Sequence, residues 1–249
     1  MSKVRVQADG RLRRVTLDDP DRRNSIDEEM RAEMLAAFTA IREDPEAGAL
    51  VVTGEGTAFC AGADLPAIFG DNTRSVATIR DDLQDVYACF LVLRSLQIPT
   101  IAAVQGPAVG AGLNLAMACD LRVVGPRAKL AATFSQIGLH PGGGCTSFLV
   151  DALGPQRALQ MLLDGGTVRG PDAVQAGLAV AYDEDPLAVA EEMARRYADM
   201  DGQLVRDIKR AVQTADRDGF EATLELESWA QASAATKPAI QEFLAQFRT

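Results

Sequence analysis

Histidine and cysteine are scarce in this chain, which limits the chemistry that its side chains can perform. The sequence contains a single histidine, His140, and four cysteines that form no C-x-x-C pair. Widely separated cysteines predict neither a zinc site nor a disulfide framework, and they fit a reducing compartment. We therefore expect a cytoplasmic protein without a bound metal ion.

An excess of positive charge is also missing. Lysine and arginine total 25 against 35 aspartates and glutamates, which gives a formal net charge of −10. Proteins that bind nucleic acids depend on clustered cations that displace counterions from phosphates. The composition therefore predicts no nucleic-acid partner, and any anionic ligand must be held by basic residues near its site.

The sequence has no uninterrupted apolar segment suited to a membrane. Its first residues, MSKVRVQADGR, are charged from position 3 and lack the apolar centre of a secretory signal. Residues 95–119 carry no formal charge, but their prolines, glycines and amide side chains would leave backbone groups unpaired in lipid. We expect this segment to be buried core, with no membrane partner.

Short apolar or alternating runs predict β-strands. The first two runs flank Asp9-Gly10, a dipeptide suited to a tight hairpin turn. The next run, Ala49–Thr53, is apolar and rich in β-branched residues, as in a strand buried on both faces. The predicted strands, including a short last one, are Val4–Gln7, Leu12–Leu17, Ala49–Thr53, Thr100–Val104, Leu121–Val124 and Leu178–Ala181.

Helical patterns lie between these strands. Ser25 and Glu28 form an S-x-x-E capping box, which predicts a helix over residues 26–42. An apolar stripe from Val76 to Leu93 predicts a second helix that ends before Pro99. Strands that alternate with helices predict an α/β fold with a largely parallel sheet.

The C-terminal quarter of the chain shows only helical patterns. We therefore divide the chain into a core, residues 1–185, and a helical region, residues 186–249. Such an appendage after an α/β core is expected to cover either its own active site or a neighbouring subunit.

Two junctions rich in glycine and alanine carry the functional signal. They are GEGTAFCAGADL, residues 54–65, and VQGPAVGAGLNLAMACD, residues 104–120. Small residues let the backbone approach a ligand, and a helix N-terminus presents unpaired N–H groups and a positive dipole end. Two such groups on one thioester oxygen would stabilise an enolate. The alternative is that the small residues only let a helix pack on the sheet.

These junctions resemble the signatures of the crotonase (enoyl-CoA hydratase/isomerase) superfamily. AFCAGADL is similar to the motif that supplies the first oxyanion donor, here the N–H of Ala63, and VQGPAVGAGLNLAMACDLRVV to the motif that supplies the second, the N–H of Ala111. Further segments resemble other landmarks of the family and occur in the family's order, so the resemblance covers residues 5–247. These segments are LDDPDRRNSID, GLHPGGG, LGPQRALQMLLDGGTV and EFLAQFR.

The resemblance implies a spiral of ββα units with a helical C-terminal region that forms a homotrimer or a dimer of trimers. It also implies an acyl-CoA thioester as the ligand, with no tightly bound cofactor and coenzyme A bent around the first motif. The matching positions for coenzyme A are Arg22, Arg23, Ser25, Ala61, Asp64 and Leu65. The two arginines are candidates for phosphate binding, and the alternative is that they lie in a solvated turn.

The sequence departs from the family at the acid–base groups. Family hydratases hold water with two glutamates, and the motifs place these positions at Asn114 and Phe134. Because neither residue has a usable basic pKa, ordinary hydration is in doubt and other groups are expected to act. His140 is the first candidate, whereas Asp64 and Asp120 are expected to cap turns. Asp71 could approach an acyl group only if its loop folds over the pocket.

Several other functions remain as alternatives. The first is a protein that binds acyl-CoA but has lost the chemistry. A nicotinamide dehydrogenase is weakly indicated, because Gly106, Gly110 and Gly112 do not have G-x-G-x-x-G spacing. A serine hydrolase is weaker still, since Ser135 and Ser147 flank His140 without a G-x-S-x-G elbow.

Overall fold

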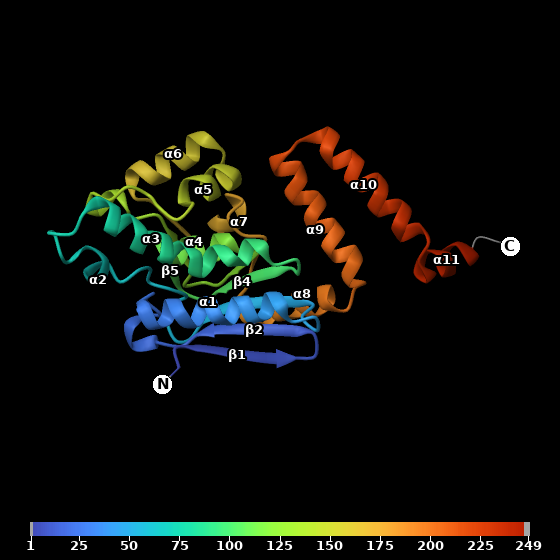
Figure 1. Cartoon of the computed structure of the whole chain (residues 1–249), viewed down its shortest axis with the longest axis horizontal. Coiled ribbons are helices and arrows are strands. Elements are labelled where there is room, and N and C mark those ends of the chain that lie inside the picture. The colour runs from blue at the N-terminus through green and yellow to red at the C-terminus, as the bar shows by residue number, and fades with distance from the viewer. Residues whose placement is uncertain (1, 247–249) are drawn as a thin grey trace.

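A six-stranded sheet forms the centre of the molecule (Figure 1). The computed structural model describes residues 2–246. The strands lie in the order β1-β2-β3-β4-β6-β9, and all neighbours are parallel except the β1–β2 hairpin. Their bounds are β1 Val4–Asp9, β2 Leu12–Leu17, β3 Ala49–Gly54, β4 Thr100–Val104, β6 Leu121–Val124 and β9 Ala181–Tyr182.

A second, smaller sheet lies next to the first. It has the order β5-β7-β8, with β5 parallel to β7 and β7 antiparallel to β8. The sequence patterns did not predict these strands, because each has only three residues and β5 lies inside a glycine-rich run. Their bounds are β5 Pro107–Val109, β7 Lys129–Ala131 and β8 Thr167–Arg169.

The strand predictions are otherwise confirmed, with two corrections. The hairpin turn consists of Gly10 and Arg11, because Asp9 still pairs with Leu12. The last strand is Ala181–Tyr182 rather than Leu178–Ala181, since Leu178 packs into the core.

Both faces of the large sheet are covered, as the apolar strands predict. Leu50 and Val52 belong to the main core, whereas Ala49 and Val51 belong to a second cluster on the opposite face. The second cluster is closed by α8, Pro186–Ala198, whose small side chains lie at four-residue spacing. This alternation reflects the two-residue period of a strand.

The first long helix begins later than the capping box predicts. Helix α1 spans Glu28–Glu43, and Asp27 is its N-cap, with the carboxylate accepting a hydrogen bond from the Met30 N–H at 2.9 Å. Ser25 instead donates to the Gly62 carbonyl at 3.3 Å. The predicted capping box is wrong because Ser25 and Ile26 pair with the loop at 62–64, which holds them outside the helix.

The second predicted helix, α3, spans Val76–Leu91 and continues as a 3-10 turn, Val92–Ser95. Its later stripe residues are buried, but Val76 is 86% exposed, so the stripe does not begin there. The remaining helices of the body are α2 Leu65–Phe69, α4 Ala111–Ala118, α5 Cys145–Leu153, α6 Pro155–Asp164 and α7 Asp172–Gln175, with short 3-10 turns at Pro20–Arg22 and Ser135–Ile137.

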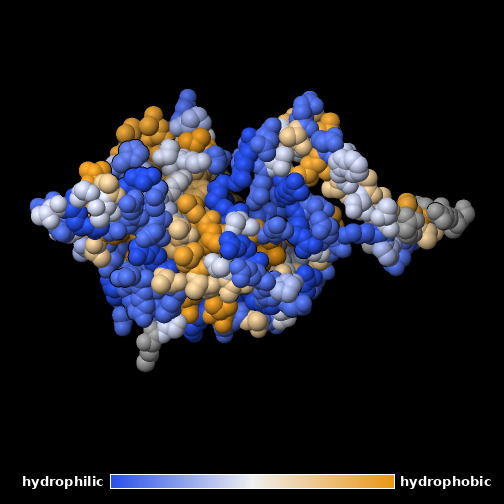
Figure 2. All heavy atoms as spheres, in the orientation of Figure 1, coloured by the Kyte–Doolittle hydropathy of each residue, from blue (hydrophilic) through white to orange (hydrophobic). Residues whose placement is uncertain are grey.

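The last three helices extend away from the body (Figure 1). They are α9 Gly202–Arg217, α10 Phe220–Ala235 and α11 Pro238–Ala245. The helical character predicted for this region is confirmed as far as the structure describes it, although Phe247 lies outside the described residues. Figure 2 shows a notch between these helices and the body with apolar residues on its sides. In residues 2–246 we find no helix long and apolar enough to cross a membrane.

Helix α4 approaches the loop after β3 so closely that only glycine fits at the contact. A Cβ atom added to Gly112 would lie 2.2 Å from the backbone oxygen of Cys60. A Cβ atom added to Gly106 would likewise lie 2.1 Å from the backbone oxygen of Thr57. These two glycines therefore set the distance between the two junctions that carry the functional signal.

We expect Gly112→Ala to lower the free energy of unfolding by about 1–3 kcal/mol, because backbone atoms must move to admit the methyl group. Gly202→Ala is the matched control, since an added Cβ there would meet only flexible arginine ends at 3.4 Å. Urea unfolding of both variants measures the difference. Equal stabilities would contradict the close approach of α4 to the loop.

Candidate active site

A cavity of about 300 Å³ lies where the two glycine-rich junctions meet. Side chains from α2, α3 and the segment at 133–142 complete its walls, and most of them are apolar. Many of the residues predicted from the sequence are brought together here, namely Ala61, Ala63, Leu65, Ala111, Asn114, Phe134 and His140.

Backbone pairing brings the two junctions into contact. The Cys60 N–H donates to the Pro107 carbonyl at 3.1 Å, and the Val109 N–H donates to the Cys60 carbonyl at 3.0 Å. Gly62 follows, and a Cβ atom added there would lie 3.6 Å from the backbone nitrogen of Ala111. The chain therefore reaches Ala63 within a short distance of the first residue of α4.

The N–H groups of Ala63 and Ala111 are both available to a ligand. Ala111 is the first residue of α4, so its N–H has no acceptor within the helix. Across residues 2–246 neither N–H has a hydrogen-bond acceptor, whereas the neighbouring Asp64 N–H donates to the Ile26 carbonyl. The N-terminus of α4 adds a positive dipole end to this part of the wall.

Asn114 is buried beside these amides, with 1% of its surface exposed. Its Nδ2 donates to the Gly142 carbonyl at 2.8 Å, and its Oδ1 has no hydrogen-bond partner among the described residues. A carboxylate could not donate to that carbonyl. The amide at this position therefore ties α4 to the turn at Gly142 and leaves one acceptor unpaired.

His140 and Phe134 also line the cavity. The Nδ1 of His140 is 2.7 Å from the Pro141 carbonyl oxygen, and because that oxygen can only accept, Nδ1 must carry the proton. The other ring nitrogen, Nε2, belongs to an exposed side chain and has no hydrogen-bond partner in residues 2–246. Phe134 offers an apolar ring, and its edge would lie 3.8 Å from a Cβ atom added to Gly110.

The aspartates near the motifs have structural partners. Asp64 caps α2 by accepting from the Ala67 N–H at 3.3 Å, and Asp120 accepts from the Thr100 N–H at 2.8 Å. The prediction that these two carboxylates satisfy backbone groups is confirmed. Asp71 accepts from the Thr73 N–H at 2.9 Å and does not line the cavity.

Other nucleophiles are poorly placed. All four cysteines are free and buried, and burial raises the pKa of the Cys60 thiol to about 12. A thiol with this pKa remains protonated at neutral pH, so it is a poor nucleophile. Ser135 and Ser147 do not line the cavity with His140.

Tyr87 is a polar cavity residue that the sequence analysis did not identify. It comes from α3, and a Cβ atom added to Gly142 would lie 2.2 Å from its hydroxyl oxygen. Burial raises the pKa of Tyr87, and the N–H of Gly143 acts in the opposite direction. Tyr87 follows Leu83 by four residues, so helical periodicity could have placed it on the edge of the apolar stripe.

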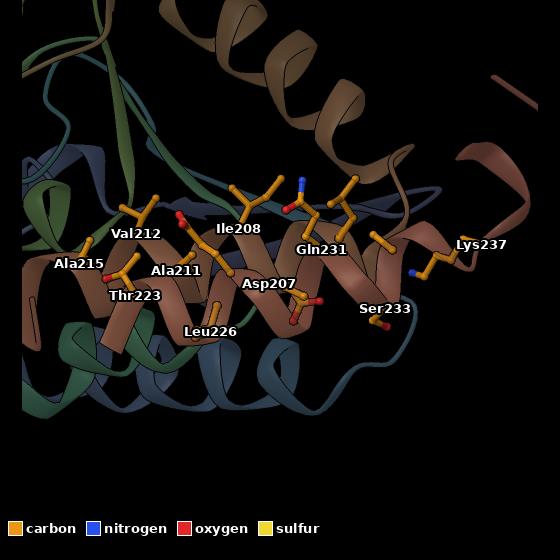
Figure 3. A pocket seen from close by; sticks show the side chains of 14 residues that line it. Asp207, Ile208, Ala211, Val212, Ala215, Thr223, Leu226, Gln231, Ser233 and Lys237 are labelled. Carbon is orange, nitrogen blue, oxygen red and sulfur yellow. The ribbon is translucent and has the colours of Figure 1, made fainter. Parts of the chain in front are cut away.

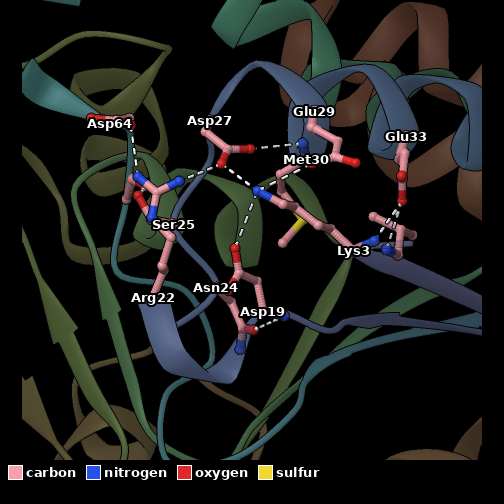
Figure 4. Close-up of polar contacts among 12 residues, drawn as sticks. Lys3, Asp19, Arg22, Asn24, Ser25, Asp27, Glu29, Met30, Glu33 and Asp64 are labelled. Carbon is pink, nitrogen blue, oxygen red and sulfur yellow. Dashed lines mark hydrogen bonds and ion pairs between the residues drawn. The ribbon is translucent and has the colours of Figure 1, made fainter. Parts of the chain in front are cut away.

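The predicted arginines do not line the cavity. Arg22 forms an ion pair with Asp64 at 2.7 Å and another with Asp27 (Figure 4). Arg23 has an exposed side chain and a left-handed backbone, with φ of 54°, and its carbonyl accepts from the Ala61 N–H at 3.0 Å. Both arginines therefore hold the loop that carries Ala63.

Lys3 extends this network to the N-terminal strand (Figure 4). It pairs with Asp27 and with Asp19, the latter at 3.3 Å, and the hydrogen bond that Lys3 donates to the Asp27 carboxylate is the main cause that raises the pKa of Lys3 to about 12. Burial acts to raise the pKa of Asp27, but the hydrogen bonds from Lys3 and the Met30 N–H outweigh it. The pKa of Asp27 is therefore below its usual value.

The lowered pKa of Asp27 makes stability depend on pH. Its contribution is complete above the ordinary aspartate pKa of about 4, and it is lost as the pH falls through the lower value of the folded state. We expect Asp27→Asn to lower the free energy of unfolding by about 1–2 kcal/mol at pH 7. Between about pH 5 and pH 2 the stability of this variant should fall less steeply than that of the parent chain. Thermal unfolding across this range measures both effects.

Asp21→Asn is the control for this prediction, because Asp21 is exposed and has no ion-pair partner among the described residues. The control should keep the pH profile of the parent chain. A profile for Asp27→Asn that matches the parent would show that the network in Figure 4 does not contribute to stability.

Comparisons with known proteins identify the family to which the chain belongs. The family model described as enoyl-CoA hydratase/isomerase matches residues 8–248. The Mycobacterium tuberculosis protein named "Probable enoyl-CoA hydratase EchA14" is 47% identical over 191 residues, which cover 77% of this chain and 73% of that protein. A 4-chlorobenzoyl coenzyme A dehalogenase-2 from Arthrobacter is 30% identical over 233 residues, which cover 92% of this chain and 84% of that protein.

A comparison with solved structures points to the same family. The enoyl-CoA hydratase from Bacillus anthracis superposes with a TM-score of 0.89 at 26% identity, over 99% of this chain and 96% of that chain. The predicted crotonase-like α/β fold with a helical C-terminal region is thereby confirmed. The chain belongs to the enoyl-CoA hydratase/isomerase family, the crotonase superfamily that its motifs resemble.

Proposed function

We propose that the chain is an enzyme that binds an acyl-CoA thioester and stabilises its enolate between the N–H groups of Ala63 and Ala111. The observation that carries the proposal is the pair of unpaired amides on one wall of a cavity. A thioester oxygen that accepts both hydrogen bonds gains negative charge as the enolate forms. Donors that are fixed in advance stabilise this charge without reorganisation.

The surroundings strengthen this effect. Most of the cavity wall is apolar, and a wall of low polarity makes each hydrogen bond to a developing charge count for more than it would in water. Removal of one oxyanion donor typically costs about 3–4 kcal/mol of transition-state stabilisation. The two amides can therefore supply a large part of the catalysis.

Proton transfer in this proposal falls to groups other than the usual glutamates. Asn114 and Phe134 occupy the positions that the resemblance assigns to those glutamates, and neither can accept a proton at neutral pH. His140 is the proposed base, because its Nε2 is free of the bond that Nδ1 makes to the Pro141 carbonyl oxygen. The proposed activity is that of a hydratase or isomerase with non-standard acid–base residues.

A second candidate function follows from the lack of glutamates at positions 114 and 134. A protein that keeps both oxyanion amides but has Asn114 and Phe134 in place of the glutamates could bind acyl-CoA without converting it. The structural role of the Asn114 amide, which holds Gly142, supports this alternative. Turnover with acyl-CoA esters distinguishes the two candidates.

Coenzyme A is proposed to lie against the outer side of the first junction. Ala61, Leu65 and Arg23 are exposed there, next to Ser25 and Asp64. Arg22 already pairs with two carboxylates, so Arg23 is the better candidate for a phosphate. In this proposal coenzyme A is part of the substrate and no tightly bound cofactor takes part.

The relatives' names support a thioester more strongly than a particular acyl group. They mention enoyl-CoA in one case and 4-chlorobenzoyl coenzyme A in another. The acyl parts differ, and coenzyme A is what the names share. We therefore assign the thioester to the oxyanion amides and leave the acyl group to the side chains of the cavity.

The C-terminal helices are proposed to form a homotrimer, alone or paired into a hexamer. A groove between α9 and α10 is lined by apolar and polar side chains, including Val212 and Leu226 (Figure 3). Nearby, Phe220 is 75% exposed and Trp229 is 71% exposed. Large apolar side chains in this number favour burial against other copies of the chain.

Replacement of Ala111 by proline tests the oxyanion proposal, because proline removes the N–H and is tolerated at the first position of a helix. We expect Ala111→Pro to reduce turnover of enoyl-CoA and hydroxyacyl-CoA esters by about 10²–10³-fold. Mass spectrometry of the products measures the rate.

Ala111→Gly is the control for this experiment, since it keeps the N–H and should keep most of the activity. Calorimetric titration with the same esters shows whether the variants still bind them. Binding without turnover in the parent chain would favour the silent binding protein. An Ala111→Pro variant as active as the parent would contradict the assignment of this amide.

The proposed assembly is tested by light scattering, which should give three or six times the protomer mass. Val212→Glu combined with Phe220→Glu places charges on the exposed apolar surface and should yield smaller species. Val76→Glu is the control, because Val76 is 86% exposed on α3, away from these helices. A monomeric parent chain would contradict the proposal.

A further inference from the structure

A short parallel pairing between two loops sets the direction of the Ala63 N–H group. The Ile26 N–H donates to the Gly62 carbonyl at 2.8 Å, and the Asp64 N–H donates to the Ile26 carbonyl at 3.1 Å. In such a pairing, successive residues direct their backbone groups to opposite sides. Because both neighbours of Ala63 bond to Ile26, the N–H of Ala63 lies on the side away from Ile26.

Arg22 bridges the two residues that follow this pair. Asp27 and Asp64 each come directly after a member of the pair. The guanidinium group donates to the Asp64 carboxylate at 2.7 Å through one terminal nitrogen and to the Asp27 carboxylate through the other (Figure 4). A planar guanidinium holds its partners in a fixed geometry. The ion pairs therefore fasten the two loops beside the peptide that carries the Ala63 N–H.

The same two carboxylates cap helices. In Asp27, Oδ1 accepts from the Met30 N–H at the start of α1, and Oδ2 accepts from Arg22. In Asp64, Oδ1 accepts from the Ala67 N–H at the start of α2, and Oδ2 accepts from Arg22. Helix α1 is fixed by four buried side chains, whereas α2 has five residues and buries one side chain. The loop before α2 is therefore the side that shifts when the arginine is lost.

Loss of the Arg22 side chain would leave Asp64 without its ion pair. Among the described residues Asp64 pairs only with Arg22, whereas Asp27 also pairs with Lys3. A catalytic donor acts within a narrow range of positions, and a displacement of about 1 Å can cost about 10²-fold in rate. We propose that Arg22 is a positioning residue that acts through Asp64 to hold the Ala63 N–H at the thioester oxygen. This inference rests on the proposed acyl-CoA function.

The positioning role differs from the phosphate role that the resemblance implies for Arg22. Two carboxylates already neutralise its charge, and its side chain does not line the cavity. A phosphate contact is made equally in the bound substrate and in the transition state, so its loss raises KM and leaves kcat. A displaced oxyanion donor weakens a bond that is strongest in the transition state, so kcat falls. The two roles therefore have different kinetic signatures.

Steady-state kinetics with enoyl-CoA and hydroxyacyl-CoA esters tests the inference. We expect Arg22→Gln to lower kcat about tenfold and to keep KM within about twofold of the parent value. Asp64→Asn removes the charge that Arg22 meets but keeps a good cap on α2. It should lower kcat to a similar extent. Because both changes break one interaction, the double variant should stay within about twofold of either single variant.

Arg42→Gln is the matched control, because the side chain of Arg42 is 43% exposed against 47% for Arg22, and its ion pair joins only the neighbouring Glu43. It should keep the kinetic constants of the parent chain. A raised KM with unchanged kcat in Arg22→Gln, or losses that multiply in the double variant, would overturn the inference and leave the proposed function intact. Absence of binding by every ester would instead contradict the proposed function.

A second measurement does not depend on turnover. Butanoyl-CoA labelled with carbon-13 at the thioester carbonyl is bound to each chain, and difference infrared spectroscopy follows the carbonyl stretch. Hydrogen bonds to the oxygen lower the frequency of this stretch. We expect a smaller downshift in Asp64→Asn than in the parent chain or Arg42→Gln, because a displaced donor makes a weaker bond. Equal downshifts would overturn the inference even if Arg22→Gln did not fold.

Discussion

The pairing of the loop after β3 with strand β5 is the interaction on which the site depends. Two backbone hydrogen bonds join Cys60 to Pro107 and Val109. Because glycine has no side chain, Gly106 and Gly112 allow the loop after β3 to approach β5 and α4 closely. Next to this pairing, the N–H groups of Ala63 and Ala111 have no acceptor in residues 2–246, and both residues line the cavity. The same constraint that packs the core therefore positions these two residues.

The rest of the molecule holds this contact in place from several directions. Helix α8 closes one face of the large sheet, while the main core fixes α1, α3 and α4 on the other. The ion pairs from Lys3 through Asp27 and Arg22 to Asp64 connect the N-terminal strand to the loop itself. Because Asp64 also caps α2, a shift of this loop would disturb charge pairs and helix ends together.

The sequence was most informative where a pattern has one physical cause. Runs such as Ala49–Thr53 are apolar because both faces of the sheet are covered, and the glycines near Ala63 and Ala111 are required by close backbone contact. The capping box at Ser25 failed because tertiary pairing with Gly62 overrode a local preference. Tyr87 was missed because an apolar stripe with one phenol resembles ordinary core, and its place in the cavity wall depends on packing against the distant turn at Gly142.

Asn114 has a structural role in the wall of the cavity. A glutamate at this position could not donate to the Gly142 carbonyl, whereas the amide does so and holds the turn against Tyr87. The amide cannot take a proton from water, but it keeps an oriented acceptor in a buried wall. The amide therefore supplies a fixed hydrogen-bonding position to the cavity wall, beside Ala63 and Ala111, whose N–H groups have no acceptor in residues 2–246.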